Sequence, residues 1–371
     1  CEKIKGSKNL NVPHLRFPEF QEEWKKCKLG DLCNVLMCKR ILASQTNTED
    51  GVPFYKIGTI GSTPDAYISK ELFDDYKVKY SYPHKGEVMI TCAGTVGKCV
   101  VYDGEDAYFQ DSNIVWIDNP TQNISNGFLF HLLSKVDWRK LNSTTIIRIY
   151  NDDLRNLKMS YPQKEEQQKI SHLLSLLDER ITTQNKIIDK LQSLIRGIAQ
   201  NIARNNQPNV LLSECLECSS STLQESDICE NGTYPVYGAN GIVGYFDDYS
   251  TEDEAVYIIK DGSGVGTVSY VTGKCSATGT LNTLQAKDGY LLQYLYYMLK
   301  VFNFEPYKTG MAIPHIYFKD YGKAKIFCPS YTEQLKYVEL LSAIDNKLSV
   351  EQRILTNLSL QKQYLLRQMF I

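Results

Sequence analysis

The chain contains two copies of one unit. The segment Ile90–Gly97 (ITCAGTVG) recurs as Ile259–Gly266 (IKDGSGVG), an offset of 169 residues (259 minus 90). Three further matches have nearly the same offset: Asn113 with Asn282, Arg148–Tyr150 with His315–Tyr317, and Tyr161–Gln167 with Cys328–Gln334. Because so many separated matches share an almost constant offset, we expect two mixed domains of one fold, each followed by a long helix.

Each copy is predicted to end in a long helix with a narrow apolar seam. After Pro162, apolar residues recur at alternating steps of four and three, which indicates a heptad seam and not a broad core face. One polar residue interrupts the apolar seam at the same place in both copies, because Gln184 matches Glu351. The predicted interface consists of Ile170, Leu174, Leu177, Ile181, Gln184, Ile188, Leu191, Ile195 and Ile198 in the first helix, and of Leu341, Ile344, Leu348, Glu351, Leu355, Leu358 and Leu365 in the second.

Such a seam must be buried against another helix, and the duplication favours pairing within the chain. A parallel pair in register would place Gln184 beside Glu351. An antiparallel pair would place the two mixed domains at opposite ends of a spacer of roughly 50 Å, at 1.5 Å per residue over residues 170–202. Oligomerisation through a coiled coil is the alternative interpretation.

The rest of each copy is predicted to be α+β. Short β-rich runs lie at Val52–Ile60, Val88–Cys92, Val100–Tyr102 and Ile114–Ile117, and in the second copy at Val256–Ile259 and Thr267–Val271. Helices are predicted at Gly127–Lys140 and Tyr290–Phe302, and the first copy is longer before its glycine segment. The predicted boundaries are 1–162 for the first mixed domain, 163–205 for the first long helix, 206–329 for the second domain and 330–371 for the second helix.

Composition excludes several classes. No apolar run is long enough to cross a membrane. Eleven scattered cysteines fit a reducing cytosol, so we expect a cytoplasmic protein. Cys215 and Cys218 form a CxxC without a second pair, which favours two ordinary thiols over a zinc site. The chain starts at Cys1, as a mature lipoprotein would, but the cysteine content argues against export, so a truncated or differently cloned start is the simpler explanation.

A net charge of −2 argues against nonspecific polyanion binding by the whole surface, yet leaves room for a local basic face. Aromatic residues are plentiful, with 25 tyrosines, many of them beside Gly, Lys or Asn. One stretch combines six cations with three carboxylates: Lys135, Arg139, Lys140, Arg148, Arg155 and Lys158 against Asp137, Asp152 and Asp153.

Common catalytic motifs do not fit this sequence. A phosphate loop would need Gly where Cys92 stands and Ser or Thr where Cys99 stands, so the glycine segments are better explained as tight turns between strands. Asn119-Pro120 is followed by Thr121, which breaks a methyltransferase signature. His315 occupies the repeat position of Arg148, which favours a binding role over acid–base catalysis.

The sequence resembles the specificity subunit of type I restriction–modification enzymes over essentially its full length. The resemblance rests on Leu15–Phe20 with Trp24 and Lys28–Leu32, on the two glycine segments, and on Pro162 followed by Glu166–Ile170 and Leu176–Asp178. The Pro–Glu–Gln start of a long helix, which occurs twice, is the most specific element. The second copy departs slightly, with Leu335-Lys336 where the first has Gln168-Lys169.

The resemblance implies two target recognition domains, each reading half of a bipartite double-stranded DNA sequence, and an antiparallel coiled coil that sets their spacing. It implies two modification subunits, which bind S-adenosylmethionine, and restriction subunits, which use ATP and Mg; no cofactor is expected in this chain itself. Candidate DNA contacts, chosen by residue type and repeat position, are Lys56, Thr91, Thr95, Lys98, Arg148 and Tyr150 in the first copy, and Lys260, Ser263, Thr267, His315, Tyr317 and Lys319 in the second.

Two alternative interpretations assign the chain to other functional classes. The chain could be a self-contained DNA modification enzyme with unusual motifs, in which case it would transfer methyl groups alone. It could also be a coiled-coil assembly protein that does not read DNA, in which case no duplex would bind even with modification partners present.

Overall fold

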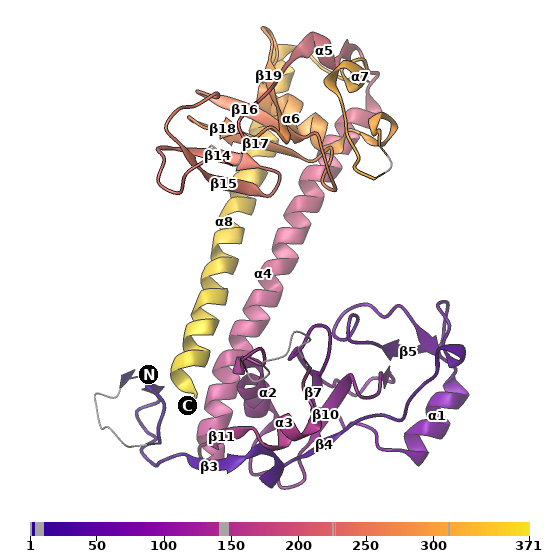
Figure 1. Cartoon of the computed structure of the whole chain (residues 1–371), viewed down its shortest axis with the longest axis vertical. Helices are drawn as coiled ribbons and strands as arrows, with labels where there is room; N and C mark the ends of the chain where they lie inside the picture. The colour runs from indigo at the N-terminus through magenta and orange to yellow at the C-terminus, as the bar shows by residue number, and fades with distance from the viewer. Residues whose placement is uncertain (1, 4–10, 141–147, 225, 227, 311) are drawn as a thin grey trace. The chain divides into compact units, whose positions relative to one another are not determined.

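The computed structural model describes residues 2–3, 11–140, 148–224, 226, 228–310 and 312–371, and Cys1 lies outside these ranges. The chain divides into two compact units: unit 1 comprises residues 1–183 and 355–371, and unit 2 comprises residues 184–354. Each unit combines one mixed domain with the adjoining parts of two long helices, α4 (Lys164–Asn205) and α8 (Tyr331–Met369) (Figure 1). Within the described ranges, no helix combines the length and apolar character needed to cross a lipid bilayer.

Unit 1 is built around a four-stranded antiparallel sheet whose two faces are both covered. Its elements are β1 (Glu2–Lys3), β2 (Leu15–Arg16), β3 (Lys25–Lys28), η1 (Leu29–Asp31), β4 (Asn34–Leu36), η2 (Ala43–Gln45), β5 (Val52–Tyr55), β6 (Tyr67–Ile68), α1 (Lys70–Lys79), β7 (Val88–Thr91), β8 (Cys99–Val101), β9 (Tyr108–Phe109), β10 (Ile114–Asp118), α2 (Asn126–Lys135), α3 (Asn151–Arg155) and β11 (Lys158–Tyr161). Successive side chains of a strand point to opposite faces. Val88 and Ile90 therefore pack in the core that holds α2 and the long helices, while Met89 packs towards the small sheet β6-β5-β9.

Unit 2 repeats this topology. Its elements are β12 (Val210–Leu211), α5 (Leu212–Cys215), β13 (Leu216–Ser220), β14 (Tyr234–Gly238), β15 (Gly241–Phe246), β16 (Glu254–Ile259), β17 (Val268–Thr272), β18 (Ser276–Ala277), β19 (Leu281–Ala286), α6 (Leu292–Val301), η4 (Glu305–Tyr307), α7 (Phe318–Tyr321) and β20 (Lys325–Ile326). The large sheet is ordered β13-β19-β16-β17, matching β4-β10-β7-β8, and the small sheet β15-β14-β18 matches β6-β5-β9. In both small sheets one strand pair is antiparallel and the other parallel. The duplicated α+β fold is thus confirmed, and α1, which has no helical counterpart between β15 and β16, contributes to the greater length of the first copy.

Several predicted boundaries need correction. The helix predicted over residues 127–140 ends at Lys135, because the chain turns into an extended conformation at Val136 and buries Trp138 elsewhere. The strand predicted to reach Ile60 ends at Tyr55, because residues 56–60 form a turn in which the carbonyl of Lys56 accepts from the amides of Thr59 and Ile60.

The predicted repeat alignment is also wrong around the glycine segment. Thr91 pairs with Ile114 across the first sheet, and Ile259 pairs with Leu281 across the second. Thr91 therefore corresponds to Ile259, and Asn282 corresponds to Val115, not to Asn113. The second glycine turn, residues 260–267, is one residue longer than the first, residues 92–98, and the stretch that follows it, residues 268–280, is two residues shorter than residues 99–113.

The two long helices pack antiparallel. In unit 1, the beginning of α4 and the end of α8 share one core, which contains Ile170, Leu174 and Leu177 together with Leu358, Met369 and the following Phe370. The Phe370 ring lies 4.8 Å from that of Phe128 in α2 and 6.4 Å from that of Trp24, measured between centroids. All the seam residues are buried or half-buried, while the residues between them are mostly exposed.

The polar break in the seam joins two equivalent residues. The Gln184 side chain donates to the backbone carbonyl of Glu351 at 3.1 Å and also to its carboxylate, which in addition pairs with Lys347. The hydrogen bonds from Lys347 and Gln184 lower the pKa of the Glu351 carboxyl. Pairing of a residue with its own repeat equivalent is possible in an antiparallel pair at only one position. This bond therefore fixes the register of the helices.

The repeated Gln of the Pro–Glu–Gln motif ties each mixed domain to its long helix. Gln167 is fully buried: its Oε1 accepts from the amide of Ser125, which precedes α2, at 2.6 Å, and its Nε2 donates to the carbonyls of Asn123 and Pro162. Gln334 does the same for α6, accepting from the amide of Leu291 at 2.9 Å and donating to Pro329. The amides at the start of a helix need such acceptors. This need explains why the glutamine of the motif occurs in both copies.

The Glu of the motif differs between the copies. Glu166 is buried and receives two hydrogen bonds of 2.7 Å from the guanidinium of Arg16, and a third from the Trp24 indole at 3.4 Å. Glu333 instead accepts from Ser330 at the start of its own helix. The N-terminal segment that supplies Arg16 and Trp24 precedes the first copy only.

We predict that replacing Gln167 with Leu lowers the free energy of unfolding by about 1–3 kcal/mol, because the buried amide of Ser125 loses its acceptor. The neighbouring Gln168 is exposed, so Gln168→Leu serves as the matched control. Chemical denaturation of both variants measures the effect. Equal stabilities would contradict the role assigned to Gln167.

Candidate nucleic-acid interface

The candidate interface is a glycine turn at the same end of the large sheet in each unit. In unit 1 it connects β7 to β8; the Thr91 amide donates to Lys98 at 3.0 Å, and the Gly97 amide donates to Thr91 at 2.8 Å. In unit 2 the amides of Ile259 and Gly266 make the equivalent bonds to Thr267 and Ile259, at 3.0 and 2.9 Å. Both turns connect antiparallel strands, as predicted, and neither leads into a helix as a phosphate loop would.

A second segment is held beside each turn by one more repeated bond. The Ile149 amide donates to the Cys92 carbonyl at 2.9 Å, and the Ile316 amide donates to the Lys260 carbonyl at the same distance. The residues on either side of Ile149 and Ile316 are the predicted contacts Arg148, Tyr150, His315 and Tyr317. The fold thus brings these two predicted parts of each site together.

Both turns need glycine for steric reasons. Gly97 has φ +82°, and a Cβ atom there would lie 2.1 Å from Cδ1 of the buried Trp138. Gly266 has φ +89°, and its Cβ would lie 3.1 Å from Cβ of Phe304. An aromatic ring therefore supports the turn in both units. The aromatic pair was missed by the sequence analysis, although its offset of 166 (304 minus 138) is close to that of the other repeats.

In unit 1 the exposed side chains are those of Thr95 and Tyr150, and Tyr150 is 61% exposed. The Arg148 guanidinium lies 5.9 Å from the centre of the Tyr150 ring and donates to the Ser112 carbonyl at 3.1 Å. A cation over an exposed aromatic ring offers both a charge for phosphate and a flat surface for a base or sugar.

Unit 2 presents a comparable set with different side chains. Tyr317 is 48% exposed, and the Lys319 ammonium lies 5.3 Å from the centre of its ring. Ser263 and Thr267 are exposed on the turn. His315 is half-buried, and its Nδ1 lies 2.5 Å from Oδ1 of Asp261, a partner that the sequence analysis did not single out. Lys260 is half-buried beside it.

Three predicted contacts of unit 1 are engaged within the protein. Thr91 is fully buried, and its hydroxyl donates to the Thr95 carbonyl and accepts from the Lys98 amide. The Lys98 ammonium donates to the Ile60 carbonyl at 2.5 Å, and Lys56 pairs with Asp65 at 2.9 Å. Thr91 is too deeply buried to reach a ligand, so its predicted contact with DNA does not fit this structure.

The basic stretch is partly neutralised by its own carboxylates. Lys140 lies 3.3 Å from Asp137, and Arg155 lies 3.2 Å from Asp152. Lys135 is half-buried, and burial lowers its pKa. These contacts leave Arg148, next to the glycine turn, as the cation of this stretch that is best placed beside an exposed aromatic ring.

The two cysteines of the CxxC segment, Cys215 and Cys218, are free thiols that are buried and half-buried. Cys215 is fully buried and bonds the carbonyls of Leu211 and Leu212, and burial raises its pKa to about 12. Burial also raises the pKa of Cys218 to about 11. Among the residues with described positions, no group of three His, Cys, Asp or Glu side chains could hold a metal ion.

Comparison with known proteins agrees with the duplicated architecture. The family model of the type I restriction modification DNA specificity domain matches twice, at residues 21–193 and 212–360. The chain belongs to this family. Each match contains one glycine turn, its aromatic support and part of a long helix, so the unit repeated in the structure is the unit that defines the family.

Individual proteins of this family are similar to the chain in sequence or in structure. A curated sequence of Haemophilus influenzae, described as a type I restriction enzyme specificity subunit, is 50% identical over 167 residues, which are 45% of this chain and 43% of the relative. The chain thus matches less than half of that relative's length. The crystal structure of a type I restriction–modification S subunit from M. genitalium has a TM-score of 0.66 at 18% identity, covering 97% of this chain and 99% of that chain.

A second solved chain comes from work on complex assembly and conformational transition of the type I system. It has a TM-score of 0.50 at 16% identity and covers 92% of this chain and 96% of that chain. These two structural likenesses support the fold of this family member.

We predict that Gly97→Ala destabilises unit 1, because the new methyl group would overlap Trp138 and the positive φ disfavours a side chain by about 1–2 kcal/mol. Gly58→Ala is the control, since a Cβ at Gly58 would meet no atom within 4 Å. Thermal unfolding should show a clear loss for Gly97→Ala only. An unchanged midpoint in that variant would contradict the assigned packing of the turn.

Proposed function

We propose that this chain is the non-catalytic DNA specificity subunit of a type I restriction–modification complex. In this proposal, residues 1–162 and 206–329 are two target recognition domains, each reading one half of a bipartite duplex. Residues 163–205 and 330–371 are the spacer helices. The observation that supports it most is the repeated site, in which the same backbone framework carries different exposed side chains in the two units.

The chemistry of the repeated site supports two readers with different preferences. The pair Arg148 and Tyr150 in one unit is replaced by His315 and Tyr317, with Lys319 nearby, in the other. Arg favours guanine O6 and N7 in the major groove, whereas His315 has its Nδ1 engaged by Asp261 and has only its Nε2 left for a ligand. A shared framework with exchanged side chains is what two domains need to read two different half-sites.

The proposed contact set is Thr95, Arg148 and Tyr150 in unit 1, and Lys260, Ser263, Thr267, His315, Tyr317 and Lys319 in unit 2. Lys56 and Lys98 would act mainly by holding the turns beside this set. The net charge of −2 fits a reader whose affinity depends on local contacts and on charged partner subunits.

The partners in this proposal are two modification subunits, docked on the long helices, and restriction subunits that join them. S-adenosylmethionine, ATP and Mg would be held by those subunits, and the complex would act in the cytoplasm. The family membership and the paired helices support this assignment.

Arg148→Ala is expected to weaken binding of the complex to its duplex target by about 1–3 kcal/mol if the guanidinium reads a base. Arg155→Ala, which removes a cation already paired with Asp152, is the control. Fluorescence anisotropy would measure both, using the assembled complex with its modification subunits.

Changing one half of the duplex at a time shows whether Arg148 reads a base in one half-site. Scrambling the half-site read by unit 1 should abolish the difference between native chain and Arg148→Ala, whereas scrambling the other half should preserve it. A difference that survives both changes would assign Arg148 to phosphate contact alone. Failure of the native complex to bind any duplex would refute the proposed function and favour a pure assembly protein.

A further inference from the structure

An exposed isoleucine lies next to the candidate interface of unit 2. Ile313 is 57% exposed and stands two residues before His315, in the loop formed by residues 309–315. The preceding Ala312 is exposed as well. An apolar side chain that stays in water contributes little to folding stability, so Ile313 is available for contact with a ligand.

The loop is held closed by its own backbone. The Thr309 amide donates to the His315 carbonyl at 2.9 Å, and the His315 amide donates to the Thr309 carbonyl at 2.7 Å. Gly310 has φ +89°, and a Cβ atom there would overlap the carbonyl oxygen of Ile313. Pro314 restricts the backbone of the residue before it to extended conformations. The Ile313 side chain is therefore presented by a backbone with little conformational freedom.

The loop and the glycine turn form one hydrogen-bonded framework. The Gly262 amide of the turn donates at 3.0 Å to the carbonyl of Pro314, the residue directly after Ile313. Ser263, a proposed contact, follows Gly262 and is exposed. On the other side of Pro314, the His315 ring bonds to Asp261 of the same turn. Ile313 therefore belongs to the surface that carries the proposed contacts of unit 2.

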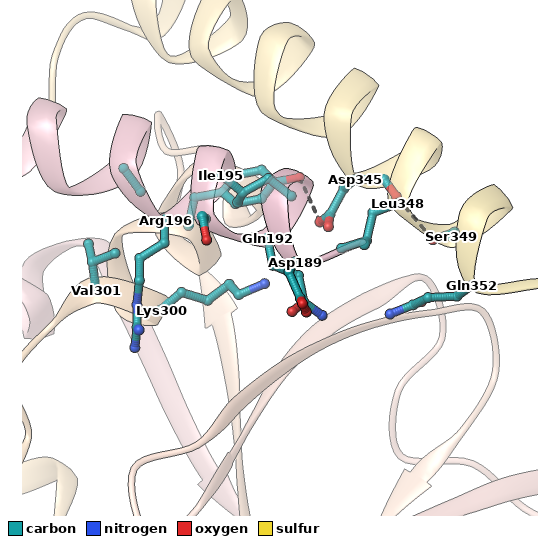
Figure 2. Close-up of a pocket in the computed structure, with 13 residues that line it drawn as sticks. Asp189, Gln192, Ile195, Arg196, Lys300, Val301, Asp345, Leu348, Ser349 and Gln352 are labelled. Carbon is teal, nitrogen blue, oxygen red and sulfur yellow. Dashed lines mark hydrogen bonds between the residues drawn. The ribbon is translucent and has the colours of Figure 1, made fainter. Parts of the chain in front are cut away.

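The base of the loop rests on aromatic packing that starts at the end of α6. Val301, the last residue of α6, lines a cavity together with Arg196 of α4 (Figure 2). The next residue, Phe302, stacks on Tyr307, with 5.8 Å between ring centroids and 22° between ring planes. Phe304 lies beneath the glycine turn. The loop begins two residues after Tyr307, so it is anchored to the helices of its unit.

The apolar surface at Ile313 is too small to dock a protein. A specific protein interface buries about 800 Å² on each partner. Ile313 and Ala312 are instead flanked by polar residues of the loop and the turn, namely Thr309, Ser263 and His315. A ligand of matching size is a single apolar group within a polar surface.

Duplex DNA offers one such group on its base edges. In the major groove the C5 methyl group of thymine is apolar, whereas the other features of the base edges are hydrogen-bond donors and acceptors. An isoleucine gains no hydrogen bond from a phosphate or from a polar edge. It removes water from a methyl group that it contacts, and this favours thymine over cytosine, which lacks the methyl group.

We propose that Ile313 reads the C5 methyl group of a thymine in the half-site of unit 2. The Nε2 of His315, two residues along, is then left for the polar edge of a neighbouring base pair. The inference rests on the proposed function, since it requires unit 2 to read duplex DNA. It predicts that this half-site contains a thymine whose methyl group contributes to affinity.

The direct test removes the methyl group from the DNA. Duplexes carry the target found by methylome sequencing, with deoxyuridine in place of thymine in one half-site at a time. Exchanging residues 206–329 for the domain of another family member changes the half-site of unit 2 and so identifies it. Fluorescence anisotropy compares the native chain with Ile313→Ala, each assembled with the modification subunits. Ile354→Ala, which shortens an exposed isoleucine of α8 in the same unit, is the matched control.

We expect deoxyuridine in the half-site of unit 2 to weaken binding by the native chain about three- to fivefold, the effect of one buried methyl group. Ile313→Ala should bind the thymine and deoxyuridine duplexes equally, because the partner of the methyl group is gone. Ile354→Ala should keep the native ratio. Deoxyuridine in the other half-site should affect the native chain and Ile313→Ala to the same extent. Thermal unfolding checks that each variant is folded.

The inference fails if the native chain binds both duplexes equally, or if the half-site of unit 2 contains no thymine; the proposed function would stand in either case. An Ile313→Ala variant that binds weakly but keeps the native sensitivity to deoxyuridine would also refute the methyl contact. It would assign Ile313 to another role, such as a wedge between base pairs. A native complex that binds no duplex would refute the proposed function, and this inference with it.

Discussion

Antiparallel packing of α4 and α8 is the constraint on which the rest of the structure depends. The seam is only one heptad stripe wide, so apolar burial alone would tolerate a shift by one heptad. The Gln184–Glu351 bonds remove this freedom, since a shift would leave the buried Glu351 side chain and its backbone carbonyl without their amide donor. Because the two residues are repeat equivalents, the same sequence feature defines the centre of both helices.

The mixed domains are attached to these helices through buried polar contacts. Gln167 and Gln334 each join the start of a long helix to the start of a domain helix. In unit 1, Arg16 and Trp24 add further bonds to Glu166. A hydrogen bond constrains direction more than an apolar contact does, so the orientation of each candidate interface on its helices is well defined within its unit.

Duplication has preserved the backbone framework and allowed the surface to change. The bonds of the glycine turns, the aromatic support by Trp138 or Phe304 and the segment beside the turn recur in both units. The exposed side chains differ, as with Arg148 and His315. The contacts beneath the long helices have diverged too: Lys362 pairs with Asp178 in unit 1, whereas Ile195 stands at the equivalent position of unit 2.

Much of this architecture could be predicted from the sequence. The heptad spacing continues over residues 170–202, so a long helix with a narrow apolar face could be predicted, and the recurring glycine segments indicated both turns. The predictions that were wrong concern local details of single turns and side chains. A constant offset could not reveal the extra residue of the second turn, nor the two residues missing after it, which place Asn282 opposite Val115 and not Asn113 in the alignment of the two copies. Residue type alone also could not show that Thr91 is buried or that Lys98 is engaged by Ile60, because these depend on packing between distant strands.

The most direct test of the account is single-molecule methylome sequencing of cells that express this chain with its cognate modification subunit. The account predicts a methylated DNA motif in two parts, separated by a gap of fixed length, that disappears when the chain is deleted. A complex that assembles but produces no such motif, or a motif that consists of a single continuous block, would contradict two separate readers in one chain.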